Sequence, residues 1–272
     1  MHFAEKALLR IFFGNGALKM DQPWLKDGER ADDLLRDNLK IIQSDDVFSF
    51  SMDAVLLTRF CTLPAKGRVM DLCTGNGVVP LLLSTRTKAA IYGLEIQERL
   101  ADMARRSVLL NGLERQITIV RGDLKQVDQY FENGSFDLVT VNPPYLPAGT
   151  GDISDNLHLA AARHELYCTL DDVLRACSKL VRFGGKVAIV HRPARLVELL
   201  SSMRQYRLEP KRIRFVHPRA GMEANMVLVE ASLGGKPEAR ILPPLIVHDQ
   251  NGNYCDELLA VYYGTADRLA LD

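Results

Sequence analysis

The fold of this chain is decided by one stretch of its sequence, Val69-Met70-Asp71-Leu72-Cys73-Thr74-Gly75-Asn76-Gly77-Val78-Val79-Pro80. An apolar run that ends in two closely spaced glycines is typical of a buried strand that turns directly into a helix. Gly75 and Gly77 allow a sharp turn and let the backbone approach a ligand at the start of that helix. Pro80 stands where a dinucleotide fingerprint has its third glycine, so the stretch disfavours a pyrophosphate ligand.

Further segments that alternate between strand and helix lie on both sides of this stretch. Strands are predicted at 68–73, 90–94, 117–120, 136–141, 187–190, 212–216 and 226–231, and an earlier short strand at 39–43. Helices are predicted at 31–37, 51–60, 78–84, 98–110, 124–131, 170–180 and 196–203, and near the end of the tail. The alternation predicts an α/β fold with a mostly parallel seven-stranded sheet and helices on both faces. The turn between the last two strands is too short for a crossover helix, so one of them runs antiparallel.

The length of 272 residues suits one α/β domain with a small N-terminal attachment. We expect an N-terminal extension at 1–24, an attachment at 25–66, the main domain at 67–233, and a tail at 234–272 that packs on that domain. The five cysteines form no CxxC pair, which argues against a metal site and disulfides and fits the cytoplasm. No apolar run approaches the roughly 18 residues of a membrane span, so no membrane partner is expected.

The charges of the chain balance overall but are unevenly distributed. Residues 175–219 hold twelve Lys or Arg and two acids, a local net charge of +10. Residues 21–58 hold nine acids and four bases, a local net charge of −5. Such a separation indicates a surface that attracts a polyanion, although solvated helix faces give the same pattern.

Three acidic residues lie on or directly after three successive predicted strands. Asp71 is on the first strand, Glu95 ends the second and Asp123 follows the third. Open α/β sheets bind ligands at the carboxyl ends of their strands, so these carboxylates are expected at one site. Glu95 can accept both ribose hydroxyls of an adenosine there. Asp123 can accept its adenine amino group, or it only caps the following helix.

The fourth strand of the predicted sheet runs into Asn142-Pro143-Pro144-Tyr145. Two prolines force an extended backbone and remove two N–H donors, which leaves carbonyl groups without strand partners. A carbonyl of Asn142 and the Pro143 carbonyl can accept both hydrogens of a planar amino group and stabilise the charge that develops on its nitrogen. Tyr145 can stack on the flat group. We therefore take Asn142, Pro143 and Tyr145 as catalytic candidates, although elsewhere such a loop would be a rigid turn.

These motifs together resemble the Rossmann-like class I methyltransferases, roughly from residue 48 to residue 232. The resemblance implies a methyltransferase domain that binds S-adenosyl-L-methionine, with the amino acid end of the cofactor near the glycines and its ribose at Glu95. It places around the cofactor Asp71, Thr74, Gly75, Asn76, Gly77, Glu95, Ile96, Asp123, Leu124 and Asn142. The loop matches the (Asn/Asp)-Pro-Pro-(Tyr/Phe/Trp) motif of enzymes that methylate adenine N6, cytosine N4, guanine N2 or a glutamine amide.

Segments outside these motifs narrow the family. From about residue 25 onward the chain is similar to the bacterial tRNA1(Val) adenine-N6 methyltransferases, through residues 25–30, 48–57, 188–193 and 243–247. This resemblance implies methylation of N6 in the adenine just 3′ of the anticodon. The first 24 residues have no counterpart in that family. The oligomeric state stays open.

Other substrates of the same chemistry also stay open. A ribosomal-RNA guanine-N2 methyltransferase is the closer competitor, because the tetrapeptide does not exclude it. A protein-glutamine methyltransferase would carry a larger N-terminal helical domain. A DNA adenine methyltransferase would need a target-recognition insertion, for which residues 146–166 are short.

The basic stretch suits phosphate contacts with RNA, and an anticodon loop offers an unpaired base that enters a pocket at small cost. The candidate RNA contacts are Tyr145, Arg192, Arg195, Lys211, Arg212, Arg214 and Arg219. His191 can contact substrate, although a histidine that ends an apolar strand is more often structural. Phe48, Phe50 and Asp53 can close over the cofactor, although Phe48 and Phe50 alternate as a buried strand face would.

Overall fold

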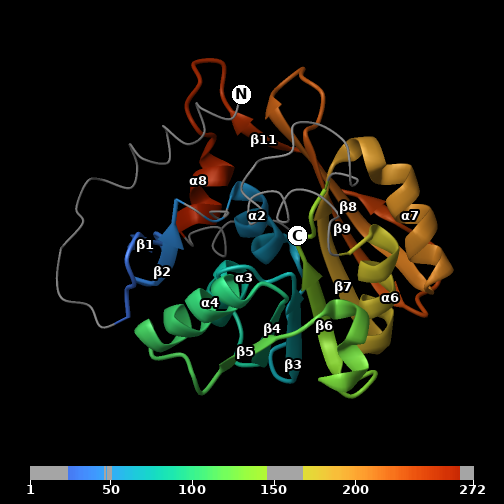
Figure 1. Cartoon of the computed structure of the whole chain (residues 1–272). Helices are drawn as coiled ribbons and strands as arrows, with labels where there is room; N and C mark the ends of the chain where they lie inside the picture. Colours follow the sequence, from blue (N-terminus) through green and yellow to red (C-terminus); the bar gives the residue numbers. More distant parts are fainter. Residues whose placement is uncertain (1–23, 46, 48–50, 146–167, 264–272) are drawn as a thin grey trace.

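A computed structural model describes residues 24–45, 47, 51–145 and 168–263 of the chain (Figure 1). The predicted N-terminal extension up to residue 23, Phe48, Phe50 and the 146–166 segment lie outside the described residues. No described helix is long and apolar enough to cross a membrane.

The centre of the described chain is one mixed sheet, with strand order β10-β8-β9-β7-β6-β3-β4-β5 and β11 also paired with β8 (Figure 1). Its strands are β3 (Arg68–Leu72), β4 (Ala90–Glu95), β5 (Ile117–Arg121), β6 (Phe136–Val141), β7 (Val181–His191), β8 (Leu208–Arg219), β9 (Met226–Leu233), β10 (Arg240–Ile241) and β11 (Leu245–His248). The seven predicted strands are confirmed, with β9 antiparallel to its neighbours β7 and β8. Two short strands from the tail, β10 and β11, extend the sheet by pairing in parallel with β8.

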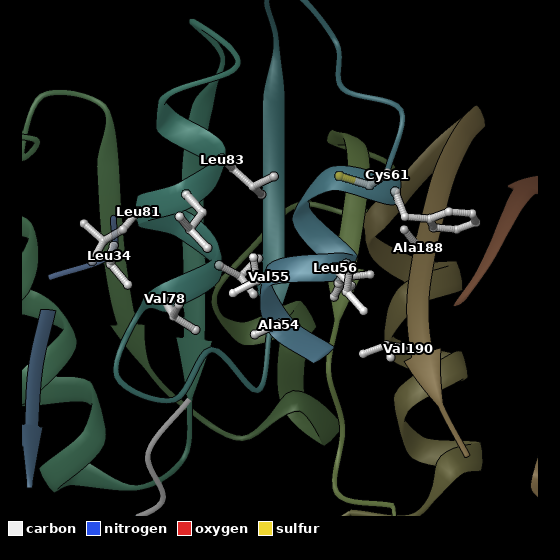
Figure 2. Packing of buried hydrophobic residues seen from close by; sticks show 14 of the residues in the cluster. Leu34, Ala54, Val55, Leu56, Cys61, Val78, Leu81, Leu83, Ala188 and Val190 are labelled. Carbon is white, nitrogen blue, oxygen red and sulfur yellow. The ribbon is translucent and has the colours of Figure 1, made fainter. Parts of the chain in front are cut away.

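Helices cover both faces of this sheet, as the sequence predicts. The helical elements are α2 (Met52–Phe60), α3 (Val78–Ser84), α4 (Glu98–Leu110), η1 (Leu124–Gln129), α6 (Leu170–Leu180), η2 (Pro193–Arg195), α7 (Leu196–Gln205) and α8 (Asp256–Tyr263). Successive residues of a strand point to opposite faces, so Val69 packs with α2, α3 and α4 while Met70 packs with α6 and α7. Figure 2 shows α2 between α3 and β7, with Leu56 facing Ala188 and Val190.

The N-terminal attachment is a hairpin of β1 (Glu29–Asp33) and β2 (Lys40–Ser44), so the helix predicted at 31–37 is wrong. Leu35, Asp37 and Asn38 have φ values of 56°, 49° and 58°, a left-handed backbone that ends any right-handed helix there. The acids that suggested a helix face instead form ion pairs in the hairpin, such as Asp33 with Lys40 at 2.7 Å.

The hairpin is fixed to α4 by hydrogen bonds and an ion pair. The side chain of Asn111 accepts the Lys40 N–H at 2.8 Å and donates to the Lys40 carbonyl at 2.7 Å. Glu29 binds the Arg106 guanidinium through two hydrogen bonds, of 2.5 and 2.8 Å. Asn76, on the turn after β3, donates to the Ile42 carbonyl at 3.2 Å. The hairpin therefore supports the turn that the two glycines form.

Candidate active site

A cavity of about 1020 Å³, including its open mouth, lies at the carboxyl ends of β3, β4, β5 and β6. Its size is that of a ligand pocket, and its place is where open α/β sheets bind ligands. Ten of the residues predicted for the cofactor or for catalysis line it, and besides Tyr145 they are Thr74, Gly75, Asn76, Glu95, Ile96, Asp123, Leu124, Asn142 and Pro143.

Glu95 ends β4 and is 5% exposed. Its two carboxylate oxygens accept one backbone N–H each, from Gly75 and from Gln97, both at 2.9 Å. Each oxygen keeps a lone pair for another donor. Burial raises the pKa of this carboxyl, and the backbone N–H groups of Gln97 and Gly75 oppose the rise. Glu95 is thus a rigid acceptor pair, suited to two adjacent hydroxyl groups.

The two glycines of the turn have different physical roles. Gly75 has a φ of 56°, and a Cβ added there would meet no atom within 4 Å, so the space beside it is open. Gly77 has a φ of 88°, and a Cβ there would lie 3.1 Å from the Cβ of Ala104. Gly77 does not line the cavity. Gly75 thus serves the ligand side of the turn, and Gly77 allows the start of α3 to lie close to Ala104 of α4.

Asp71 lies outside the cavity lining, although the sequence places it among the cofactor residues. Its side chain is 1% exposed and accepts a 2.7 Å hydrogen bond from the Thr140 hydroxyl. Burial raises the pKa of Asp71 to about 7, against the hydrogen bond of Thr140, which lowers it. Asp71 therefore joins β3 to β6 beneath the turn and has no contact surface in the cavity.

Asp123 combines the two roles that the sequence left open. Its carboxylate accepts the Lys125 N–H at 2.9 Å and so caps η1. It also lines the cavity beside Leu124 and Gly122. A carboxylate that keeps free lone pairs at this place can accept an amino group of a ligand.

The side chains of the loop after β6 are held in one arrangement. The Tyr145 hydroxyl lies 2.6 Å from Asp53 Oδ2 and within hydrogen-bond distance of Asn142 Oδ1. Arg195 donates to the Tyr145 carbonyl at 3.2 Å, and the guanidinium of Arg192 lies 5.1 Å from the centre of the tyrosine ring. Burial and the Asp53 carboxylate raise the pKa of Tyr145 well above its ordinary value, so the phenol stays protonated.

Two residues outside the motifs join this cluster. Asp53, on the first turn of α2, lines the cavity and was noted in the sequence only as a residue that can close over the cofactor. The signal for it was the Ser51-Met52-Asp53 helix start just before the first strand of the fold. His191, which ends β7, packs edge-on against Tyr145, with 5.5 Å between the centres of the two rings. Burial lowers the pKa of His191 to about 4, so its ring is neutral at pH 7.

The basic residues predicted to contact RNA separate into two groups. Arg192 and Arg195 follow β7 and lie beside Tyr145, next to the cavity. Arg212 instead donates to the Phe60 carbonyl and to the buried carboxylate of Glu230, and Arg214 binds Glu257 of α8 at 2.5 Å.

The remaining two basic residues also lie on β8. Lys211 donates to the Lys236 carbonyl at 3.1 Å. Arg219 ends β8, which is three strands from β6 in the sheet order. At a strand spacing of about 4.8 Å, this is roughly 14 Å from the loop. Of the predicted basic RNA contacts, Arg192 and Arg195 are therefore the two that adjoin the site.

Comparison with known proteins identifies the family. The methyltransferase small domain family matches residues 38–193, which is more than half of the chain. A tRNA1(Val) (adenine(37)-N6)-methyltransferase of Aeromonas salmonicida is 31% identical over 209 residues, which cover 76% of this chain and 85% of that protein. The chain belongs to the methyltransferase small domain family. The resemblance noted in the sequence is thereby confirmed.

Solved structures agree on the fold. A predicted O-methyltransferase from Agrobacterium tumefaciens has a TM-score of 0.63 at 24% identity, and the match covers 78% of this chain and 96% of that one. Geranyl diphosphate C-methyltransferase from Streptomyces coelicolor, in complex with S-adenosyl-L-homocysteine, has a TM-score of 0.50 at 14% identity over 66% of this chain and 78% of that one. The Rossmann-like methyltransferase fold is confirmed.

The protein is a methyltransferase that uses S-adenosyl-L-methionine, and the cavity fits this cofactor. Among the described residues, the lining holds no Lys or Arg. It holds the carboxylates of Glu95 and Asp123, and that of Asp53, which is bound to the Tyr145 hydroxyl. Such a lining suits a ligand with a sulfonium, an ammonium and a ribose, and it disfavours a pyrophosphate. The open space beside Gly75 and the acceptor pair of Glu95 provide room and partners for the nucleoside.

Proposed function

We propose that this protein methylates the exocyclic N6 of adenine in RNA, with adenine 37 of tRNA1(Val), the substrate in its relatives' names, as its target. The observation that carries the proposal is the place of Asn142 and Pro143, which lie on the cavity wall directly after β6. S-adenosyl-L-methionine supplies an activated methyl group when it is bound. The chain's own contribution is to hold an amino group in line with that methyl.

Asn142 and Pro143 are proposed to hold the amino group through two carbonyl oxygens. Each oxygen accepts one hydrogen of the planar amino group, so the nitrogen is fixed by two hydrogen bonds. As the nitrogen gains positive charge, both hydrogen bonds strengthen, which stabilises the transition state. Tyr145 offers a ring face on which the base can stack. The amino nitrogen can lose its proton after the transfer, so the proposal needs no general base.

The RNA itself is proposed to approach over Arg192 and Arg195. Both guanidinium groups adjoin Tyr145, so a base stacked on Tyr145 would bring its phosphates near them. Arg195 is also paired with Glu198 at 2.6 Å, so Arg192 is the main proposed phosphate contact. An unpaired loop nucleotide can enter the cavity without the cost of opening a duplex. An anticodon loop of a cytoplasmic tRNA offers both an unpaired base for the cavity and phosphates for the arginine side chains.

The proposal is tested by offering the purified protein several substrates with labelled S-adenosyl-L-methionine. Bulk tRNA, ribosomal RNA, DNA and protein are incubated separately, and labelled material is digested to nucleosides or amino acids. We expect label in N6-methyladenosine from tRNA and, after fractionation, in tRNA1(Val). Label in N2-methylguanosine would replace the adenine assignment, and label in DNA or in protein alone would overturn the RNA substrate.

A further inference from the structure

The Tyr145 hydroxyl lies between two acceptors in the cavity wall. Its oxygen is 2.6 Å from Asp53 Oδ2 and within hydrogen-bond distance of Asn142 Oδ1. A phenol carries one proton, so it can make a full hydrogen bond to only one of these oxygens. Which of the two receives that proton decides what the Asn142 amide can offer to a substrate.

The carboxylate of Asp53 is buried and oriented by its own donors. Asp53 is 7% exposed, and its Oδ1 accepts the Ala54 N–H at 2.8 Å and the Ser51 hydroxyl. The other oxygen, Oδ2, is the one that meets Tyr145. A carboxylate is a stronger acceptor than an amide carbonyl, so the phenol proton goes to Asp53.

This preference fixes the orientation of the neighbouring amide. Once its proton is on the Asp53 side, the phenol oxygen can only accept, and Asn142 satisfies it by presenting Nδ2–H. The side-chain carbonyl Oδ1 is then turned away from Tyr145 and is free to accept a hydrogen from the substrate. We propose that Asp53 is a positioning residue that, through the Tyr145 hydroxyl, orients the Asn142 amide toward the amino group to be methylated. The inference rests on the proposed role of Asn142.

The arrangement is a property of this site and not of the tetrapeptide. The fourth position of the motif can also be Phe or Trp, and neither has a hydroxyl that could orient the asparagine amide. Here Tyr145 is paired with a carboxylate from α2, and its carbonyl is held by Arg195 at 3.2 Å. Arg195 therefore holds the backbone of Tyr145, and Asp53 holds the hydroxyl of its side chain.

Asp53→Asn tests the proposal because it replaces the acceptor that faces the Tyr145 hydroxyl with a donor. The direction of the hydrogen bonds from Asp53 through Tyr145 to Asn142 is thereby reversed. The donors Ala54 N–H and Ser51 hydroxyl hold the carbonyl oxygen of Asn at the position of Oδ1. The new NH2 group then faces Tyr145 and donates to the phenol oxygen. The phenol proton must turn to Asn142 Oδ1 and so occupies the acceptor that the substrate needs.

The kinetic test is a double-mutant cycle with Asp53→Asn, Tyr145→Phe and their combination. Each single variant is expected to lower kcat for the RNA by about 10- to 100-fold, the range for misplaced catalytic groups. The combination should lose no more than about threefold beyond Tyr145→Phe, because Asp53 acts through the hydroxyl. Affinity for S-adenosyl-L-homocysteine, measured by calorimetry, should stay within about threefold of wild type. Asp45→Asn, an exposed acid away from the cavity, is the control.

Two results in these experiments would overturn the proposal. Losses that multiply in the double variant would show that Asp53 acts without Tyr145. A tenfold or larger fall in affinity for S-adenosyl-L-homocysteine in Asp53→Asn would make Asp53 a cofactor contact instead.

An activity-independent readout separates this inference from the proposed function. In protein labelled with 15N-asparagine, the Asn142 side-chain amide is assigned by its loss in Asn142→Ala. Its resonance should move in both Asp53→Asn and Tyr145→Phe and stay in place in Asp45→Asn. If tRNA receives no methyl group but the resonance moves, the proposed substrate fails and the positioning role stands. An unmoved resonance in Tyr145→Phe overturns the positioning role, even if Asp53→Asn does not fold.

Discussion

Glu95 is the residue on which cofactor affinity should depend most, because its two oxygens already lie in fixed positions at the cavity wall. Glu95→Ala removes the two charge-assisted hydrogen bonds that its carboxylate is expected to accept from the ribose hydroxyls of the cofactor. It also leaves the Gly75 N–H without its acceptor. We expect affinity for S-adenosyl-L-methionine to fall by about 10- to 100-fold, measured by calorimetry. Glu98→Ala, three residues on and half exposed, serves as control and should bind normally. Equal affinity in wild type and Glu95→Ala would reject the role.

Asp71 should make the stability of the protein depend on pH. Its folded pKa of about 7 lies above its ordinary value of 3.8, so the folded state binds the extra proton between these values. The free energy of unfolding therefore falls as pH rises through this window. The loss of stability is complete above pH 7, where Asp71 is ionised in the folded state as well. Asp71→Asn keeps an acceptor for Thr140 and should raise stability at pH 8 by at most about 4 kcal/mol.

The measurement is urea denaturation of Asp71→Asn and wild type at pH 8 and at pH 4.5. The gain should shrink toward the lower pH, where wild-type Asp71 is protonated in the folded state. A gain of the same size at both pH values would show that ionisation of Asp71 is not its source.

At the scale of elements, the close approach of the start of α3 to Ala104 of α4 depends on Gly77. Gly77→Ala places a Cβ 3.1 Å from Ala104 on a backbone with a φ of 88°. Gly112→Ala has a similar φ of 65° but meets no atom within 4 Å, so it is the matched control. We expect a loss of about 1 kcal/mol in the control from backbone strain, and about 1–3 kcal/mol more at Gly77 from the clash. Urea denaturation measures both, and equal losses would contradict the packing role.

The elements around the cavity could be predicted from sequence because their signals are local. Each strand ends in the residue types that its turn requires. The alternation of strands and helices along the chain makes the strands parallel, so their carboxyl ends meet at one edge of the sheet. The strand predicted at 39–43 is found as β2. Its partner β1 could not be predicted, since the acids there suit a helix surface and the left-handed turn at Leu35, Asp37 and Asn38 holds no glycine. The hairpin depends on tertiary contacts with α4, such as that of Asn111.

Contacts between distant parts of the chain explain the differences at the site itself. Asp71 was expected in the cavity, but Thr140, 69 positions away, holds it beneath the turn. Arg212 and Arg214 were expected to face RNA, and Glu230 and Glu257 bind them within the fold. Such partners lie on other elements, and a count of charges along the chain does not reveal them.

At the scale of the whole molecule, the proposed RNA surface is narrower than the basic stretch from which it was predicted. Arg192→Ala should weaken tRNA binding and reduce its salt dependence by about 0.7–0.9 per lost phosphate contact. Arg240→Ala, an exposed change of the same charge on β10, is the control. Filter binding over a range of salt concentrations measures both, and identical salt slopes for the two variants would remove Arg192 from the interface.

The central claim is that the Asn142 side chain takes part in methyl transfer, and Asn142→Ala tests it most directly. In single-turnover assays with labelled S-adenosyl-L-methionine and tRNA, we expect a rate at least about 100-fold below wild type. Affinity for S-adenosyl-L-homocysteine should stay within about threefold. Asn142→Asp, which keeps a carbonyl oxygen and matches the motif, should retain measurable activity. A rate for Asn142→Ala close to that of wild type, at normal cofactor affinity, would contradict the claim.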